Sequence, residues 1–304
     1  MDEYPMTLTE FEDNFHTETQ CREYVAKLRY PNGIYLCHKC GSDKTWNVRE
    51  MLYECSKCGY QGSIIAGTIF QDTHKPLRLW FQAMWYITSQ KNGTSALGLQ
   101  RILGLGSYKT AWTWLHKLRR AMINPDRDKL SGTVEVDEAF FGGFRKGKRG
   151  RGSENKILVA IAVEISDNDT VGRVRLAVVD DASKENLHGF IKCVIKEGST
   201  VMTDGWSGYN GITSEGYKHL VQKCSEDSTL PHVHTVVSLI KRWILGTMQG
   251  SISREYLEYY CDEFTFRFNR RKSKSRGLLF YRLLQNAVRL PPIFYKEVRE
   301  NCAK

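Results

Sequence analysis

The chain has 304 residues and a formal net charge of +10 at pH 7, with 44 lysines and arginines against 34 aspartates and glutamates. Its hydrophobic content of 41% excludes a chain disordered throughout and predicts two or three domains. The opening residues are acidic without an apolar signal segment, and no apolar run is long enough to span a bilayer, so a cytoplasmic protein without a membrane partner is expected.

The first 68 residues are dominated by a cysteine pattern. Residues 1–30 are expected to form a helical lead-in, with helical periodicity from Asn14 to Leu28. Residues 31–68 then carry two Cys-x-x-Cys pairs, whose thiolates can close a tetrahedral site. We predict a zinc ribbon in which a structural Zn²⁺ is held by Cys37, Cys40, Cys55 and Cys58.

Residues 69–128 are expected to be helical. The apolar stripe within 77–87 predicts one helix, and 95–103 and 107–122 predict two more around Gly104-Leu105-Gly106. The last two have helix-turn-helix proportions, and Lys109 lies on the helix that would enter a major groove. A plain helical hairpin is the alternative, so DNA binding by this segment is a hypothesis.

Residues 129–285 alternate between strand and helix patterns, and residues 286–304 are expected to be a C-terminal tail. Strands are predicted over 133–141, 157–165, 174–179, 199–203 and 219–223, with helices over 184–197, 234–247 and 253–269. This order indicates a mixed sheet flanked by helices. The predicted fold class is therefore multidomain α/β, with a small zinc ribbon, a helix-turn-helix-like segment and a mixed-sheet core.

Two aspartates end β-branched runs in this core. Asp137 lies in Thr133–Glu138, and Asp204 follows Ser199–Thr203. Within the first strand Glu135 and Asp137 share a face, which makes Asp137 the ligand candidate. Carboxylates from separate strands can share Mg²⁺ ions, and such sites carry out phosphoryl transfer. The structural alternatives are a surface edge position for Asp137 and a turn aspartate for Asp204.

Positive charge gathers in two further segments. Between residues 145 and 151 it includes Arg145, Lys146, Lys148 and Arg149, and between 267 and 276 it includes Arg270 and Arg271. Clustered cations attract polyanions, so nucleic acid is the expected partner and association with the nucleoid the expected location.

Several motifs in order resemble the DDE-type insertion-sequence transposases, in the zinc-ribbon branch called ISXO-like. The matching segments are Val136-Asp137-Glu138 with Phe141-Gly142-Gly143, then Thr203–Tyr209, Ser238–Thr247 and Tyr260–Arg271. The resemblance covers residues 25–280. It implies a ribonuclease H-like core that uses Mg²⁺ or Mn²⁺ to cut double-stranded DNA at the ends of an element. The 3′ ends are then joined to target DNA, with the protein acting as a homo-oligomer on DNA.

The resemblance also implies a third ligand beside Asp137 and Asp204. Its usual acidic position falls on His234, and imidazole is a softer, uncharged ligand that favours Mn²⁺. The other candidates are His232, Asp262 and Glu263. Lys241, two helical turns beyond His234, and the adjoining Arg242 are expected to contact DNA.

Trp206 and Tyr209 follow Asp204, and we interpret them as aromatic side chains that stack on a flipped or frayed terminal DNA base. Core packing is an equal alternative for Trp206. Two other functions stay open. One is a nuclease on the same core without end joining. The other is a catalytically inactive or domesticated DNA-binding protein, which the histidine at the third position leaves open.

Overall fold

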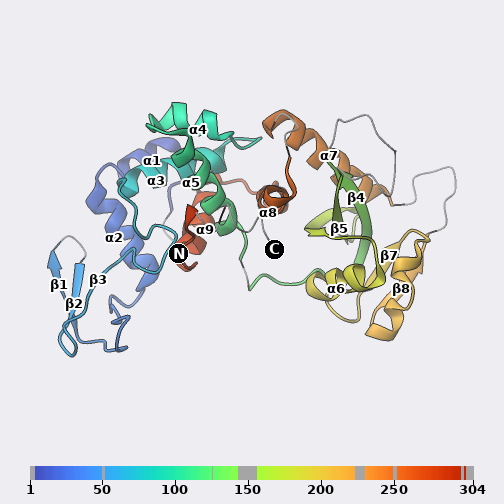
Figure 1. Cartoon of the computed structure of the whole chain (residues 1–304), viewed down its shortest axis with the longest axis horizontal. Coiled ribbons are helices and arrows are strands. Elements are labelled where there is room, and N and C mark those ends of the chain that lie inside the picture. The colour runs from blue at the N-terminus through green and yellow to red at the C-terminus, as the bar shows by residue number, and fades with distance from the viewer. Residues whose placement is uncertain are drawn as a thin grey trace. The chain divides into compact units, whose positions relative to one another are not determined.

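The computed structural model describes residues 4–49, 52–124, 126–142, 156–222, 230–248, 252–295 and 298. The chain divides into two compact units, Met1–Asn124 with Ser273–Lys304 and Pro125–Lys272 (Figure 1). Arg145, Lys146, Lys148 and Arg149 lie outside the described residues. Within the described ranges, no helix is both long and apolar enough to cross a membrane. The five-part division of the chain into functional domains stays a prediction.

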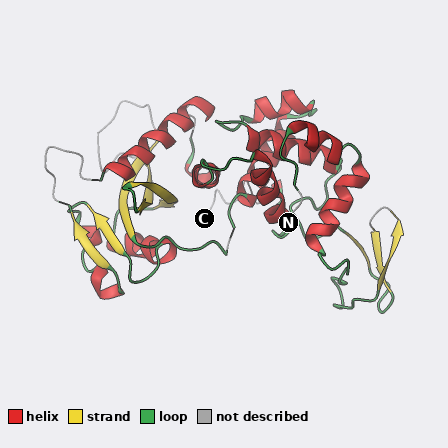
Figure 2. Ribbon diagram, turned by 180° about the vertical axis from the view of Figure 1, so that it is seen from behind, coloured by secondary structure: helices red, strands yellow, loops and turns green. Residues whose placement is uncertain are grey.

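The first unit combines helices with a small antiparallel ribbon (Figure 2). Its helices are α1 Leu8–Asn14, α2 Glu18–Arg29, α3 Leu77–Ser89, α4 Ala96–Leu103, α5 Tyr108–Ala121 and α9 Arg276–Ala287. The ribbon strands are β1 Thr45–Arg49, β2 Leu52–Cys55 and β3 Gln61–Ser63, paired in that order. The expected ribbon and helical segments are therefore both present in the structure.

The predicted helical lead-in consists of two helices. A break before Glu18 separates α1 from α2, because Thr17 begins a new helix with a capping box. The Thr17 hydroxyl accepts a bond from Gln20 N, and the Gln20 side chain accepts one from Thr17 N. The Thr-x-x-Gln spacing was readable in the sequence, but helical periodicity alone did not show the break.

Helix α3 is capped by a residue from another helix. Its own N-cap position is Pro76, which supplies no capping side chain. The Glu18 carboxylate of α2 instead accepts bonds from Leu77 N and Arg78 N, at 2.9 and 3.1 Å. A carboxylate at a helix N-terminus satisfies free N–H groups and complements the helix dipole. This contact fixes α2 against the start of α3.

Aromatic packing completes the first unit. Trp80 of α3 stacks on Trp114 of α5 with ring centroids 3.8 Å apart, and both are buried. Phe280 of α9 packs edge-on against Phe81 of α3 at 5.6 Å. The apolar stripe over 77–87 is thus confirmed as core. Helix α9 was not predicted, and it packs here although it follows the second unit in sequence.

The second unit is built on a five-stranded sheet in the order β6-β5-β4-β7-β8. Its strands are β4 Thr133–Phe141, β5 Ile157–Ser166, β6 Thr170–Val179, β7 Thr200–Thr203 and β8 Lys218–Val221. Strands β4, β5 and β6 are antiparallel, whereas β7 runs parallel to both β4 and β8. Helix α6 Lys184–Val194 connects the antiparallel part to β7. The predicted mixed sheet flanked by helices is therefore confirmed.

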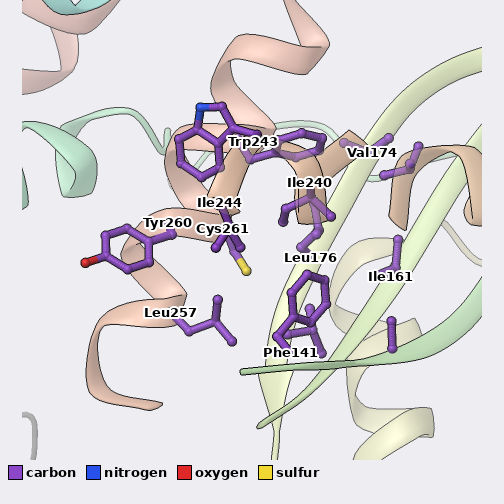
Figure 3. Close-up of a cluster of buried hydrophobic side chains, with 14 of the residues drawn as sticks. Phe141, Ile161, Val174, Leu176, Ile240, Trp243, Ile244, Leu257, Tyr260 and Cys261 are labelled. Atoms are coloured by element: carbon purple, nitrogen blue, oxygen red, sulfur yellow. The ribbon is translucent and has the colours of Figure 1, made fainter. Parts of the chain in front are cut away.

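Two layers cover this sheet. On one face lie α7 Pro231–Met248 and α8 Arg254–Asn269. Figure 3 shows their side chains gathered beside those of the strands: Ile240, Trp243, Ile244, Leu257, Tyr260 and Cys261 against Phe141, Ile161, Val174 and Leu176. On the other face lie α6 and two short 3-10 helices, η1 Ser207–Tyr209 and η2 Ile212–Glu215.

The alternation along β4 decides which side chains reach each layer. Val134 and Val136 belong to the core on the α6 side, while Ala139 and Phe141 belong to the core on the α7 side. Successive strand residues point to opposite faces, so Asp137 shares the α7 face with Ala139. The sheet therefore presents Asp137 to the layer that carries His234.

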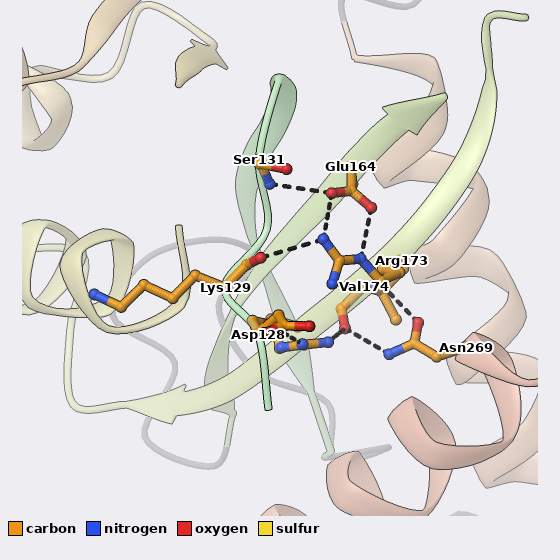
Figure 4. A network of polar contacts seen from close by, with 8 residues as sticks. Asp128, Lys129, Ser131, Glu164, Arg173, Val174 and Asn269 are labelled. Carbon is orange, nitrogen blue, oxygen red and sulfur yellow. Dashed lines mark hydrogen bonds and ion pairs between the residues drawn. The ribbon is translucent and has the colours of Figure 1, made fainter. Parts of the chain in front are cut away.

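A polar network holds the edge of the sheet (Figure 4). Glu164 of β5 accepts two bonds from Arg173 of β6, at 2.7 and 2.8 Å, and one from Ser131 N. The Asn269 side chain of α8 accepts from Val174 N and donates to Val174 O, as a neighbouring strand would. Because an open edge invites pairing with another chain, this amide protects β6.

The pKa of Glu164 makes this network a source of pH-dependent stability. Burial raises that pKa, but the bonds from Arg173 and Ser131 outweigh it and hold the pKa below its ordinary value of 4.5. A depressed carboxyl pKa stabilises the fold above the unfolded-state pKa, and this contribution is lost as pH falls through the folded-state pKa. We expect the free energy of unfolding, measured with urea, to fall between about pH 6 and pH 3 in the wild type. The fall should be smaller in Glu164→Gln, and parallel pH profiles for the two proteins would contradict this role.

Candidate functional site

The four ribbon cysteines are arranged as a metal site. Their sulfur atoms all lie within 4.8 Å of one another, and the Cys37–Cys58 and Cys40–Cys55 pairs are each 3.6 Å apart. A tetrahedron with Zn–S bonds of about 2.3 Å has S–S edges of about 3.8 Å. The four thiolates therefore fit a structural Zn²⁺.

Backbone turns shape each half of this cysteine site. Gly41 N donates to Cys37 O, and Gly59 N donates to Cys55 O, at 2.8 and 2.9 Å. Both glycines have positive φ angles of 70° and 66°. A residue with a Cβ rarely adopts this conformation, so each Cys-x-x-Cys-Gly segment folds back with its two sulfurs on the same side.

The second site is formed where β4 and β7 run side by side. Their parallel register pairs Thr133 with Thr200 and Glu135 with Met202. Continuing that register by two residues places Asp204 opposite Asp137. Because the same step preserves the alternation of faces, both carboxylates belong to the α7 face of the sheet. The structure thus brings together the two aspartates that the sequence singled out.

The electrostatics of Asp137 fit a cation site. Burial, with the negative charges of Glu138 and Asp204, raises the pKa of Asp137 to about 6, although a bond from Glu138 N and the nearby His234 act in the other direction. Asp204 accepts a bond from Trp206 N at 3.0 Å, which orients its carboxylate. A divalent cation between these two carboxylates would offset their negative charge.

His234 is the histidine that reaches this pair. Its Nε2 lies 3.5 Å from Asp137 Oδ2, and half of its side chain is exposed. His232 points elsewhere, with Nδ1 2.7 Å from Glu135 and Nε2 3.2 Å from Asp169 O. Glu263 is buried and paired with Arg267 at 2.8 Å. Among the alternatives for a third ligand, the geometry therefore favours His234 over His232 and Glu263.

The predicted DNA-binding cations of the second unit differ in the contacts they make within the protein. Lys241 and Arg242 are exposed on α7, and Lys241 Nζ lies 5.6 Å from the centre of the Phe141 ring. Arg270 stacks on Phe266 and donates to its carbonyl. Arg271 stacks on Phe268 and donates to the carbonyls of Val171 and Gly172 on β6. Arg270 and Arg271 therefore also stabilise the end of α8.

Lys109 lies on the helical pair of the first unit. Gly104 ends α4 in the left-handed conformation, with φ 60°, and Leu105 is buried behind the turn. Ser107, Tyr108 and Lys109 are exposed at the start of α5, and Lys109 Nζ lies 4.0 Å from the Tyr295 ring centre. The exposed start of the second helix is the part of a helix-turn-helix that reads bases.

The stacking interpretation of Tyr209 is wrong in this structure. Tyr209 is fully buried, and its hydroxyl donates to Glu138 Oε2 at 2.8 Å. Trp206 is half-buried and donates from Nε1 to Ala182 O. Both aromatic residues therefore pack the loop after Asp204 onto the core. The sequence did not distinguish these roles, because an aromatic residue beside glycines fits a ligand loop as well as a packed turn.

Two family models match this chain. Residues 129–269 match the ISXO2-like transposase domain, and residues 16–61 match the transposase zinc-ribbon domain. The chain is 26% identical, over 280 residues, to a protein of Halobacterium salinarum named as an uncharacterized protein in transposable element ISH50. The match covers 83% of this chain and 91% of that protein. Among solved structures, the catalytic core domain of BIV integrase is 11% identical with a TM-score of 0.34, covering 48% of this chain and 89% of that one.

The cysteine geometry predicts that replacing one of the four cysteines abolishes zinc binding by the ribbon. Purified wild type should contain about one Zn²⁺ per chain, and Cys55→Ser should contain almost none, because three thiolates close a tetrahedral site poorly. The measurements are metal content by atomic absorption and protease sensitivity of residues 31–68. Cys193→Ser, at an exposed cysteine outside the cluster, is the matched control. Full zinc content in Cys55→Ser would remove that cysteine from the site.

Proposed function

We propose that this chain, which belongs to the ISXO2-like transposase family, cuts double-stranded DNA at the inverted-repeat ends of an insertion sequence and joins the 3′ ends to target DNA. The observation that carries the proposal is the juxtaposition of Asp137, Asp204 and His234 on one face of the mixed sheet. Hydrolysis and end joining are both in-line displacements at phosphorus, so a single site of this kind serves both steps.

In this proposal the three side chains are the ligands of divalent metal ions, either Mg²⁺ or Mn²⁺. The bound ions would activate the attacking water or 3′-hydroxyl and stabilise the leaving oxygen. The protein supplies the placement, because β4 and β7 are buried strands and α7 is packed against β4 and β5. A histidine in place of a third carboxylate makes the site less negative, which favours the softer Mn²⁺.

DNA binding is distributed over both units in this proposal. Lys241 lies seven residues from His234 on α7, about two turns along the helix, where its ammonium can meet a phosphate near the scissile bond. Arg242 is exposed beside it. The start of α5 with Lys109 and the zinc ribbon would recognise the element ends, and Arg270 and Arg271 would add backbone contacts. Because two ends must be joined, a homo-oligomer on DNA is the expected assembly.

Nicking of supercoiled plasmid tests the carboxylate pair. We expect the wild type to nick plasmid carrying the element's ends in Mn²⁺ or Mg²⁺ and to lose this activity in EDTA. The Asp137→Asn/Asp204→Asn protein should bind the same DNA but leave it intact, because the amides keep the shape and remove the charge. Nicking that survives in this variant would place the catalytic centre elsewhere. Nicking by the wild type without any joined product would instead indicate a nuclease.

His234 is tested separately by end joining to a target plasmid. His234→Ala should abolish joining while DNA binding, measured by fluorescence anisotropy, stays at the wild-type level. His234→Glu restores an oxygen ligand and should recover joining with a higher ratio of Mg²⁺ to Mn²⁺ activity. Thr235→Ala, at the next exposed position of the same helical turn, is the control and should behave as wild type. Normal joining by His234→Ala would exclude this residue as the third ligand.

A further inference from the structure

In the sequence of β4, Asp137 lies between two glutamates whose side chains point to opposite faces of the sheet. Glu135 shares the α7 face with Asp137, whereas Glu138 shares the opposite face with Val136. Glu135 is only 1% exposed, and Tyr209, the partner of Glu138, is fully buried. Glu138 itself is half-buried. A carboxylate removed from water is costly unless it is hydrogen-bonded, so the partners of these two residues indicate what each one holds.

Glu135 holds the beginning of α7. Its Oε2 accepts a bond from Val233 N at 2.8 Å, and its Oε1 lies 2.7 Å from His232 Nδ1. Helix α7 has no acidic residue in its own first turn, and this carboxylate from β4 supplies negative charge at its N-terminus. His234 is the next residue after Val233. The contact therefore sets how far along β4 the His234 ring lies, and it lies 3.5 Å from Asp137.

Glu138 holds the loop that follows Asp204. Its Oε2 accepts the bond from the Tyr209 hydroxyl, and Tyr209 ends η1, five residues after Asp204. The loop leaves no spare room, because a Cβ added at Gly208 would lie 2.6 Å from Ala182 O. Trp206 Nε1 donates to the same carbonyl. The bond from Tyr209 to Glu138 thus fastens this packed loop directly to β4, next to Asp137.

We infer that Glu135 and Glu138 are positioning residues, each fastening one partner of Asp137 to β4: Glu135 fastens α7 with His234, and Glu138 fastens the loop of Asp204. The inference rests on the proposed metal-dependent function of the site. Residues that orient metal ligands in this way typically change metal affinity by about 10-fold to 100-fold when they are replaced. The three members of the site come from separate elements, and β4 is the element to which the other two are fastened.

The test is Mn²⁺ binding to the full-length protein, followed by the electron paramagnetic resonance signal of free Mn²⁺. Tyr209→Phe removes only the hydroxyl that bonds Glu138, and we expect about 10-fold weaker binding. Glu135→Leu removes both contacts to α7 and should weaken binding by at least as much. Glu135→Gln keeps an acceptor for Val233 N, so its affinity should lie between those of the wild type and Glu135→Leu. This partial rescue is not expected if Glu135 merely fills space.

Two matched controls come from the same unit. Tyr217→Phe removes another buried hydroxyl, which bonds Ile195 O, and Glu164→Gln neutralises another bonded carboxylate of the sheet. Both should bind Mn²⁺ as the wild type does. Circular dichroism and zinc content establish that each variant is folded. If Glu135→Leu does not fold, Glu135→Gln and Tyr209→Phe decide the question, and wild-type affinity in both would overturn the inference.

The outcomes separate this inference from the proposed function. Mn²⁺ binding that is unchanged in Asp137→Asn/Asp204→Asn would sink the proposed metal site itself. Mn²⁺ binding that depends on the two aspartates but not on Glu135 or Tyr209 would contradict only the positioning role. Weaker binding in Tyr209→Phe and in Glu135→Leu, with both controls at the wild-type level, would support both.

Discussion

The parallel pairing of β4 with β7 is the interaction on which the candidate active site depends. These strands are not joined by a hairpin, because β5, β6 and α6 lie between them in the chain. The pairing carries Asp204 to the side of Asp137 across 67 residues of sequence, as the observed pairs Thr133–Thr200 and Glu135–Met202 require. A slip of one residue would turn Asp204 to the opposite face, away from α7. The hydrophobic residues Val201 and Met202, which face opposite cores, hold the register that the carboxylates need.

A second device recurs in both units, where a glutamate from one element caps the helix of another. Glu18 of α2 accepts bonds from the first N–H groups of α3, and Glu135 of β4 accepts from Val233 N of α7. A local cap fixes only where a helix begins, whereas a distant carboxylate also fixes which neighbour the helix start lies against. The zinc-ribbon unit uses this device to pack helices. In the sheet unit the capping glutamate is Glu135, two residues before Asp137. A small displacement of α7 there would move His234 relative to the proposed site.

The parts of the structure that depend on local patterns could be predicted from the sequence. The spacing of Cys37, Cys40, Cys55 and Cys58 predicted a four-thiolate cluster, and the two apolar runs ending in Asp137 and Asp204 predicted strands that the structure contains. Helix α9 was missed as a member of the first unit, because its partners α3 and α5 are more than 150 residues earlier in the chain. The burial of Tyr209 was missed for the same reason, since its partner Glu138 is 71 residues away. Sequence periodicity shows which face is apolar, but it does not show which distant element covers that face.

The histidine at the third position changes the electrostatic balance of the proposed site rather than its architecture. Three carboxylates around one centre would repel each other strongly. Burial, with smaller contributions from the charges of Glu138 and Asp204, already raises the pKa of Asp137 to about 6. His234 adds a donor without a further negative charge, and its nearness lowers that pKa instead. The cost is a weaker attraction for hard divalent ions, since Mg²⁺ prefers oxygen ligands. The position of the His234 ring then has to compensate for the missing negative charge, because a neutral ligand binds a cation well only when it is already held in place. In the positioning role that we infer for Glu135, its bond from Val233 N, the residue before His234, supplies that placement.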